Sequence, residues 1–275
     1  MLKQRIITAV ILAAVFFAAL FALPPVYFAA VTLVALMTAV YEWAKLAGLQ
    51  PAASLGAAGG ALLLGGALLL ATGFSAARGF PEAPVLALCG AAAVFWIAVA
   101  PLWLLRGWPT RHPVGMTAVG VIAVLALWMA MAQLQARSPW LLLAVMMVVW
   151  IADTAAYFAG RKFGRRKLAP TISPGKSWEG VYGGLLCVLA YAVLLLLFSP
   201  LAAHATLSRP LVAAFALVLA MASVVGDLFE SWLKRQAGVK DSGTALPGHG
   251  GVLDRIDALL PALPLATLFI ALLSY

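Results

Sequence analysis

Acidic and basic side chains gather in one short segment of the sequence, residues 227–257. Five of the nine carboxylates of the chain lie there. The carboxylates are Asp227, Glu230, Asp241, Asp254 and Asp257, and the basic or ionisable side chains between them are Lys234, Arg235, Lys240, His249 and Arg255. Because the chain has so few charges, this density marks the segment as the place where chemistry is most expected.

Two pairs of carboxylates in this segment have helical spacing. Asp227 and Glu230 lie three residues apart at the end of an apolar run, so a helix would place them on one face with Lys234. Asp254 and Asp257 repeat the spacing at the start of the last apolar run. Salt bridges would account for the first pair, and capping would account for the second, since a helix N-terminus favours negative charge.

A shared cation is the alternative to these structural explanations. Carboxylate oxygens are hard ligands of the kind that Mg²⁺ prefers, and Mg²⁺ binds few carboxylates and shares phosphate oxygens. Two carboxylate pairs joined by a loop therefore favour metal-assisted phosphate chemistry over a zinc site. His249 lies among glycines, where backbone amides can approach an anion, which favours a phosphate contact or a structural hydrogen bond over a metal ligand.

A second polar cluster, residues 161–179, precedes another apolar run. Its Gly-Lys-Ser tripeptide at 175–177 looks like the end of a nucleotide-binding P-loop, but Pro170 stands where that motif requires glycine, and no strand is expected before it. A P-loop is therefore rejected. Lys176 at the start of a helix still predicts an anion site, formed by its charge and the free amides of the helix end. The basic run 161–167 is either a topology signal that attracts anionic lipid head groups or a direct substrate contact.

The elements that must hold these clusters are membrane helices. Of 275 residues, 65% are hydrophobic and 10% are charged, against about 45–50% and about 25% in soluble domains. A soluble fold and a disordered chain are excluded, because too few polar residues exist to cover a surface in water. Apolar runs of about 20 residues predict an all-α, polytopic integral membrane protein with about nine transmembrane helices. The runs lie at residues 5–23, 26–47, 52–72, 84–105, 114–134, 139–160, 178–198, 210–232 and 257–274.

The distribution of lysine and arginine predicts how these helices are oriented. With nine spans, fifteen of the eighteen basic residues fall on one side, which the positive-inside rule assigns to the cytoplasm. The N-terminus is then cytoplasmic and the C-terminus external. Loops 161–177 and 233–256 both face the cytoplasm, where nucleotides are. Basic residues scattered through short loops are topology signals, so the net charge of +9 does not indicate nucleic-acid binding.

The chain divides into two parts of unequal charge. Residues 1–137 carry only two carboxylates, Glu42 and Glu82, and are expected to supply packing, a lipid-access groove or a contact in a homodimer. Residues 138–275 carry the other seven and form the expected catalytic part. The first apolar run is expected to be a retained helix rather than a cleaved signal peptide. Two isolated cysteines inside apolar runs exclude a disulfide framework and a zinc site.

The segment that begins at Ser231 resembles the signature of the phosphatidate cytidylyltransferases, the CDP-diacylglycerol synthases. It reads SWLKRQAGVKDSGTALPGHGGVLDRID. The matching positions are Ser231, Lys234, Arg235, Lys240, Asp241, Gly243, Pro247, His249, Gly250, Gly251, Asp254, Arg255 and Asp257. Residues 153–164 and 173–180 are similar to the DxxAYxxGxxFG and SPxKxxEG stretches of the same family. The resemblance covers roughly residues 150–260, and the first half shares only its many spans and the stretch at 41–43.

This resemblance implies a nucleotidyltransferase of phospholipid biosynthesis in a bacterial cytoplasmic membrane. Its substrates would be CTP and phosphatidate, its products CDP-diacylglycerol and pyrophosphate, and its cofactor Mg²⁺, with one or two cations in the site. The lipid phosphate would attack the α-phosphorus of CTP in line. Because this nucleophile is already an anion, the site needs no strong base and must instead bring two anions together and stabilise the leaving group.

We assign the polar residues hypothetical roles from this chemistry. Asp227 and Asp254 are the expected principal metal ligands. Asp257, Glu230 and Asp241 are the second choices as ligands. The expected catalytic residues are Asp227, Asp254, Lys234 and Arg235, and the expected substrate-binding residues are Ser173, Lys176, Ser177, Lys240, His249 and Arg255. Lys240 and Asp241 would otherwise pair only with their neighbours.

Three other functions share parts of this pattern. Cytidylyl transfer to a different lipid phosphate would need the same residues. An ion-coupled transporter would also place carboxylates in its spans, but transporters usually carry internal repeats, and the first half holds no second copy of the 227–257 pattern. A CDP-alcohol phosphotransferase would open its motif with DGxxAR, which is absent, and it shares only the spacing of Asp254 and Asp257.

Overall fold

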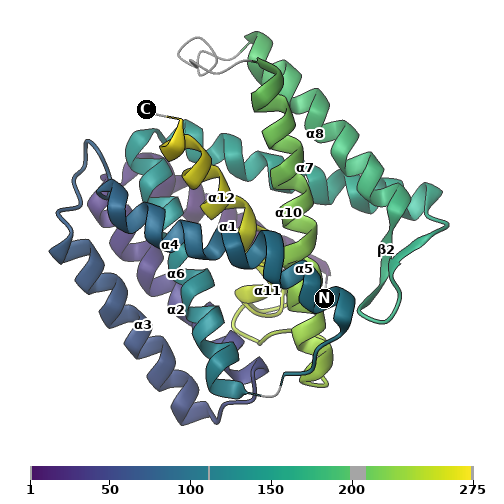
Figure 1. Cartoon of the computed structure of the whole chain (residues 1–275), viewed down its shortest axis with the longest axis horizontal. Coiled ribbons are helices and arrows are strands. Elements are labelled where there is room, and N and C mark those ends of the chain that lie inside the picture. Colours follow the sequence, from purple (N-terminus) through teal and green to yellow (C-terminus); the bar gives the residue numbers. More distant parts are fainter. Residues whose placement is uncertain (1, 111, 199–208, 274–275) are drawn as a thin grey trace.

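The predicted spans are present as helices (Figure 1). The computed structural model describes residues 2–110, 112–198 and 209–273. Within these ranges, seven helices are long and apolar enough to cross a membrane, and two shorter apolar stretches, Ile6–Ala22 of the first helix and the helix Leu259–Leu272, complete the set of nine. The prediction of a helical, polytopic membrane protein is confirmed. Two predicted positions lie outside the described residues. They are Arg111, one of the fifteen basic residues expected on the cytoplasmic side, and Ser274, the end of the last predicted run.

Proline marks the start of several of these helices. In chain order the elements are α1 (Leu2–Ala22), α2 (Pro25–Leu46), α3 (Pro51–Ala71), α4 (Glu82–Val94), η1 (Phe95–Val99), α5 (Ala100–Arg106), α6 (Pro113–Arg137), α7 (Pro139–Phe163), β1 (Lys167–Ala169), β2 (Ser173–Ser177), α8 (Trp178–Phe198), α10 (Arg209–Gln236), α11 (Leu253–Ile256) and α12 (Leu259–Leu272). Helices α2, α3, α6 and α7 each begin at a proline, which has no amide hydrogen to leave unpaired there. The elements α4, η1 and α5 run on without a break and form one span.

Helix α6 forms the centre of the main bundle. Every residue from Ala123 to Gln135 is buried, and α2, α3, α4, α7 and α12 pack around this helix. Gln135 Nε2 donates to the carbonyl oxygens of Leu20 and Leu23, at 3.3 and 3.2 Å. A buried amide is costly without such partners, so these bonds fix the end of α1 against α6.

Helices α7 and α8 form an antiparallel pair that leans away from the bundle, with α10 packed against both (Figure 1). Glycines of α8 face alanines of α7 and let the two backbones approach closely. A Cβ on Gly184, for example, would lie 2.9 Å from the carbonyl oxygen of Ala152. Strands β1 and β2 form a small hairpin at one end of this pair.

Long-range hydrogen bonds bring both basic loops to one end of the molecule. Arg235 Nε, at the end of α10, donates to the carbonyl oxygen of Ile172 in the β1–β2 turn (3.2 Å). Thr8 Oγ1, near the start of α1, donates to the carbonyl oxygen of Pro247 in the loop after α10 (3.2 Å). The start of α1 and both long basic loops therefore lie at the same end of the helices.

Gly226 lies where α10 packs against the start of α12 and the segment before it. This packing leaves no room for a side chain at position 226. A Cβ there would strike the carbonyl oxygen of Asp257 and lie 2.7 Å from Cδ of Pro261, and neither group moves aside cheaply. We expect Gly226→Ala to destabilise the protein by about 1–3 kcal/mol and to lower the thermal midpoint in detergent. Gly66→Ala is the control, because a Cβ there meets nothing within 4 Å. Equal midpoints for the two variants would contradict this packing.

Candidate functional site

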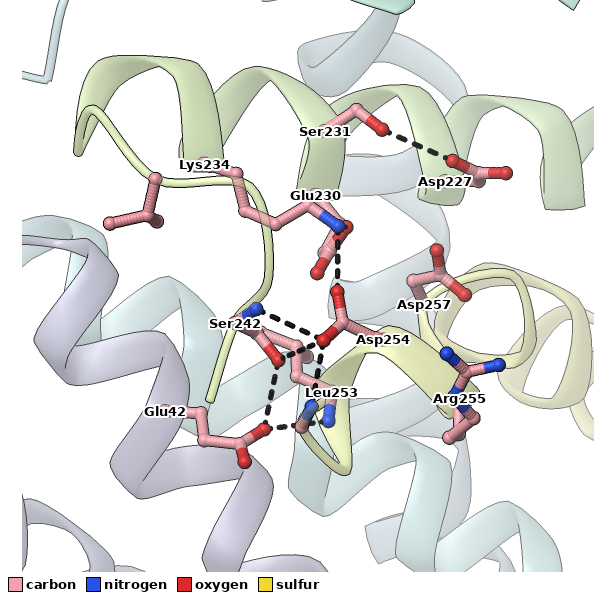
Figure 2. A network of polar contacts seen from close by, with 12 residues as sticks. Glu42, Asp227, Glu230, Ser231, Lys234, Ser242, Leu253, Asp254, Arg255 and Asp257 are labelled. Atoms are coloured by element: carbon pink, nitrogen blue, oxygen red, sulfur yellow. Dashed lines mark hydrogen bonds and ion pairs between the residues drawn. The ribbon is translucent and has the colours of Figure 1, made fainter. Parts of the chain in front are cut away.

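The last turns of α10 carry four polar side chains on one face (Figure 2). Ser231 Oγ donates to Asp227 Oδ1 (3.2 Å), and Lys234 Nζ lies 2.5 Å from Glu230 Oε2. The face predicted from the residue spacing is therefore present. The side chain of Glu230 is 1% exposed and that of Lys234 is 12% exposed, so this ion pair is buried.

Asp254 accepts the largest number of hydrogen bonds in this region. Its Oδ1 accepts from Lys234 Nζ (2.7 Å), and its Oδ2 accepts from the amide and hydroxyl of Ser242 (3.0 and 2.9 Å) and from the amide of Gly251 (2.8 Å). Burial pushes the pKa of Asp254 upward, but the bond from Lys234 and those from the two amides outweigh burial and hold the pKa at about 2. Asp254 therefore carries a full negative charge near neutral pH.

A second group of carboxylates surrounds Lys176 of β2. Lys176 Nζ lies 2.6 Å from Asp227 Oδ2, and these side chains are 26% and 30% exposed. Asp153 of α7 and Asp257 lie close enough to interact electrostatically with both. Burial, followed by the charge of Asp227, raises the pKa of Asp257 well above its ordinary value. Three carboxylates thus share one lysine, and a bound cation would offset the repulsion that raises this pKa.

The loop between α10 and α11 lines an open polar cavity of about 660 Å³. Asp241, His249, Gly250 and Arg255 line it together with loop backbone. Arg255 Nη2 donates to the carbonyl oxygen of His249 (2.7 Å). Within the described part of the chain, Nδ1 of His249 is buried without a hydrogen-bond partner. A Cβ on Gly250 would lie 2.8 Å from Asp254 Oδ2, so the cavity adjoins the Asp254 carboxylate.

Two further predicted cations lie at the surface of this end. Arg235 donates to the carbonyl oxygens of Ile172 and, at 3.5 Å, Val239, so it connects the two basic loops. Lys240 is exposed at the start of the α10–α11 loop, next to the exposed Asp241. Both cations are accessible from water, unlike Lys234.

The Gly-Lys-Ser tripeptide at 175–177 lies in strand β2. Strand β1 runs directly before Pro170, so the expectation that no strand precedes this position is wrong. The hairpin forms because Ala169 pairs with Ser173 across a tight turn. Pro170 still occupies the position of the P-loop glycine, and β1 leads into this turn rather than into a glycine-rich loop. The rejection of a P-loop is unchanged.

The helix that follows, α8, has a capped N-terminus. The amide of Trp178 donates to the carbonyl oxygen of Arg166 (2.9 Å), and the amide of Gly180 donates to Ser177 Oγ (3.2 Å). The prediction of free amides at this helix end is therefore wrong for both residues, because the hairpin supplies acceptors nearby. Ser177 is buried as the cap, whereas Ser173, like Lys176, stays partly exposed.

The sequence pattern assigned no role to two residues of this site, although both lie in stretches that resemble the family. Glu42 of α2 is 3% exposed and accepts hydrogen bonds from the hydroxyl of Ser242 (3.1 Å) and the amides of Val252 (3.1 Å) and Leu253 (2.8 Å). Asp153 is the second, in the group around Lys176. Both are carboxylates within apolar runs, where a charge is costly unless it is paired, and this signal was available in the sequence.

The donor atoms of the site suit Mg²⁺ in their chemical type, but the carboxylates are too few at one point to hold the ion alone. Among the residues that the structure describes, no group of three or more His, Cys, Asp or Glu side chains is arranged to hold a metal ion. The carboxylates of Asp227 and Asp257 nevertheless offer hard oxygens, and a bound cation would favour the charged form of Asp257. Mg²⁺ takes one or two carboxylates and completes its shell with phosphate oxygens and water. The residues therefore fit a cation that binds together with a phosphate.

Comparison with known proteins gives similarity along nearly the whole chain. Residues 3–273 match the cytidylyltransferase family. The chain is 40% identical over 272 residues to the phosphatidate cytidylyltransferase of Pseudomonas aeruginosa, which covers 96% of this chain and 95% of the relative. It is 36% identical over 294 residues to the phosphatidate cytidylyltransferase of Haemophilus influenzae, which covers 98% of each. A protein of the same description from Brucella suis is 50% identical over 127 residues, 46% of this chain and 45% of the relative.

Proposed function

Since the chain belongs to the cytidylyltransferase family, we infer that it transfers the cytidylyl group of CTP to phosphatidate, forming CDP-diacylglycerol and pyrophosphate. It is an integral membrane nucleotidyltransferase of phospholipid biosynthesis. The observation that carries this function is the similarity to two phosphatidate cytidylyltransferases over at least 95% of both chains. The family predicted from the motifs is confirmed.

The reaction requires two anionic substrates to meet. A bond forms between an oxygen of the lipid phosphate and the α-phosphorus of CTP, and the bond from that phosphorus to the bridging oxygen breaks, so pyrophosphate leaves with the electron pair. Repulsion between the substrates and charge on the leaving group are the main barriers. We propose that Lys176 and Lys234 bind the phosphate oxygens deep in the site, while Arg235, Lys240 and Arg255 bind them near the water.

Support for these roles comes from where the cations lie. Lys176 and Lys234 project from different elements, β2 and α10, and each is paired with a carboxylate that an arriving phosphate can replace as its partner. Arg255 borders the cavity of the α10–α11 loop, beside His249. Ser173 lies on the same strand as Lys176. In a water-poor site such contacts are worth more than in bulk water.

Mg²⁺ is the proposed cofactor. When bound, it would neutralise phosphate oxygens and the charge that builds on the leaving pyrophosphate. We propose Asp227 as its principal ligand together with Asp257. The oxygens of Asp254 already accept four hydrogen bonds, one of them from Lys234. Asp254 would therefore become a ligand of Mg²⁺ only when Lys234 leaves it to bind a phosphate oxygen. Glu230 then stays the partner of Lys234, and Asp241 lies in the neighbouring cavity.

We propose that the site faces the cytoplasm of a bacterial cell, with the N-terminus inside and the C-terminus outside. The positive-inside rule supports this orientation, because the start of α1 and both basic loops lie at one end of the helices. CTP would reach the site from the water and phosphatidate from the bilayer. A homodimer contact through the first half stays a prediction.

The test of the proposed function is a direct assay. Purified protein in detergent or liposomes, given labelled CTP, phosphatidate and Mg²⁺, is expected to form a labelled CDP-lipid, and chelation of Mg²⁺ with EDTA is expected to abolish the product. Absence of product with Mg²⁺ present would show the inferred activity to be wrong. Equal rates with a polyprenyl phosphate would show that phosphatidate is not the specific acceptor.

A further inference from the structure

Glu42 reaches the catalytic end of the molecule from the half of the chain that has few charges. It lies one turn before the end of α2, and its carboxylate points into the loop that leads to α11 (Figure 2). Oε1 accepts from the amide of Val252, and Oε2 accepts from the amide of Leu253 and the hydroxyl of Ser242. No basic side chain is paired with Glu42 among the described residues, so loop donors alone compensate its charge.

The loop is shaped around this carboxylate. A Cβ on Gly243 or on Gly251 would strike an oxygen of Glu42, so the backbone at both positions closes on the carboxylate without room for a side chain. Glu42 is 3% exposed. A buried carboxylate without such donors would be strongly unfavourable, so the contacts with the loop form as one unit.

The same loop atoms hold Asp254. The hydroxyl of Ser242 lies 3.1 Å from Glu42 Oε2 and 2.9 Å from Asp254 Oδ2, so it bridges the two carboxylates, which share its single proton. The two amides that donate hydrogen bonds to Glu42 belong to the two residues directly before Asp254. Any shift of the Glu42 carboxylate therefore moves Asp254 through two routes, the hydroxyl bridge and the backbone.

We propose that Glu42 is a positioning residue, which holds the loop of residues 242–253 so that Asp254 keeps Lys234 in the geometry in which this lysine meets the phosphates. This inference rests on the proposed cytidylyl transfer. It gives the N-terminal half a part in the catalytic site, beyond packing, lipid access or a dimer contact. Glu42 itself contacts neither substrate.

Glu42→Gln tests the proposal with little change of size. Glutamine keeps a single acceptor oxygen and turns an NH₂ group toward loop donors, so the loop loses its fixed position. We expect kcat to fall about 100-fold, as a displacement of about 1 Å can cost, while the KM for CTP changes less than about threefold. Glu82→Gln is the matched control, because Glu82 is the other carboxylate of the first half and is exposed. An unchanged kcat for Glu42→Gln would overturn the proposal.

Hydrogen–deuterium exchange provides a readout that does not depend on activity. In Glu42→Gln, amide exchange in residues 242–254 is expected to be at least tenfold faster, because one of the amides of Val252 and Leu253 loses its acceptor and faces an NH₂ group instead. Exchange in the central helix α6 is expected to stay as in the unchanged protein. Uniformly faster exchange across the chain would overturn the positioning role in favour of general destabilisation.

Ser242→Ala decides the question if Glu42→Gln does not fold. It removes only the hydroxyl bridge and leaves both amide bonds to Glu42 in place, so kcat is expected to fall about tenfold, equivalent to the loss of one hydrogen bond to a charged group. An unchanged kcat would overturn the proposal. If the unchanged protein forms no CDP-lipid, the proposed function fails, whereas the exchange experiment still tests whether Glu42 holds the loop.

Discussion

Asp227→Asn is expected to lower kcat about 10³-fold while the protein stays folded. The substitution keeps the size of the side chain and removes the charge that pairs with Lys176 at 2.6 Å and that we propose as principal ligand of Mg²⁺. A thousandfold loss corresponds to about 4 kcal/mol, within the several kcal/mol that a catalytic metal supplies to a phosphoryl transition state. The measurement is the initial rate at saturating CTP and phosphatidate over a range of Mg²⁺ concentrations.

The fold should tolerate Asp227→Asn because the pair is near water. The side chains of Asp227 and Lys176 are 30% and 26% exposed, so water can replace the lost partner, and the cost is about 1 kcal/mol or less. Glu82→Gln again serves as the control, with unchanged rate and thermal midpoint. A kcat within about threefold of the unchanged protein, at every Mg²⁺ concentration, would remove Asp227 from the proposed metal site.

Lys234→Met is expected to reduce both stability and activity. Lys234 lies between Glu230 and Asp254, whose side chains are 1% and 7% exposed. Removing the cation leaves two buried carboxylates next to each other, and breaking a buried ion pair in this way costs about 3–5 kcal/mol. Activity should fall by at least about 10³-fold, because a cation proposed to meet the phosphates is also lost.

The double variant Lys234→Met/Glu230→Gln separates these two effects. It removes one of the two uncompensated charges, and Asp254 keeps its bonds from Ser242 and Gly251. We expect the double variant to recover most of the thermal midpoint that Lys234→Met loses, while the rate of CDP-lipid formation stays low. Recovery of both midpoint and rate would mean that Lys234 is only the partner of Glu230 and has no role toward substrate.

Most of the helical architecture was predictable because membrane insertion is a local property of sequence. A run of about 20 apolar residues crosses the hydrocarbon layer wherever it stands in a chain. The predicted runs therefore agree with the helices to within a few residues, as in the run 178–198, which is α8. The β1–β2 hairpin escaped prediction, since pairing of Ala169 with Ser173 depends on a turn and not on an apolar pattern.

The candidate site was predictable only where its residues are neighbours on one helix. The shared face of Asp227, Glu230 and Lys234 follows from helical spacing alone. The pairing of Lys234 with Asp254 joins residues from two elements, and the bonds of Glu42 join residues about two hundred positions apart. No periodicity carries such information, because many other carboxylates could meet the same donors with the same local pattern.

By itself, the sequence determined that this protein is a membrane enzyme of the cytidylyltransferase family, with a charged segment near its C-terminus in which we propose that the chemistry takes place. Composition and motif are properties of consecutive residues, so they need no coordinates. Only the tertiary structure decided which charges neutralise one another. A buried charge takes the partner that packing brings within hydrogen-bond distance. Packing brought Lys176 to Asp227, Lys234 between Glu230 and Asp254, and Glu42 into the loop beside them.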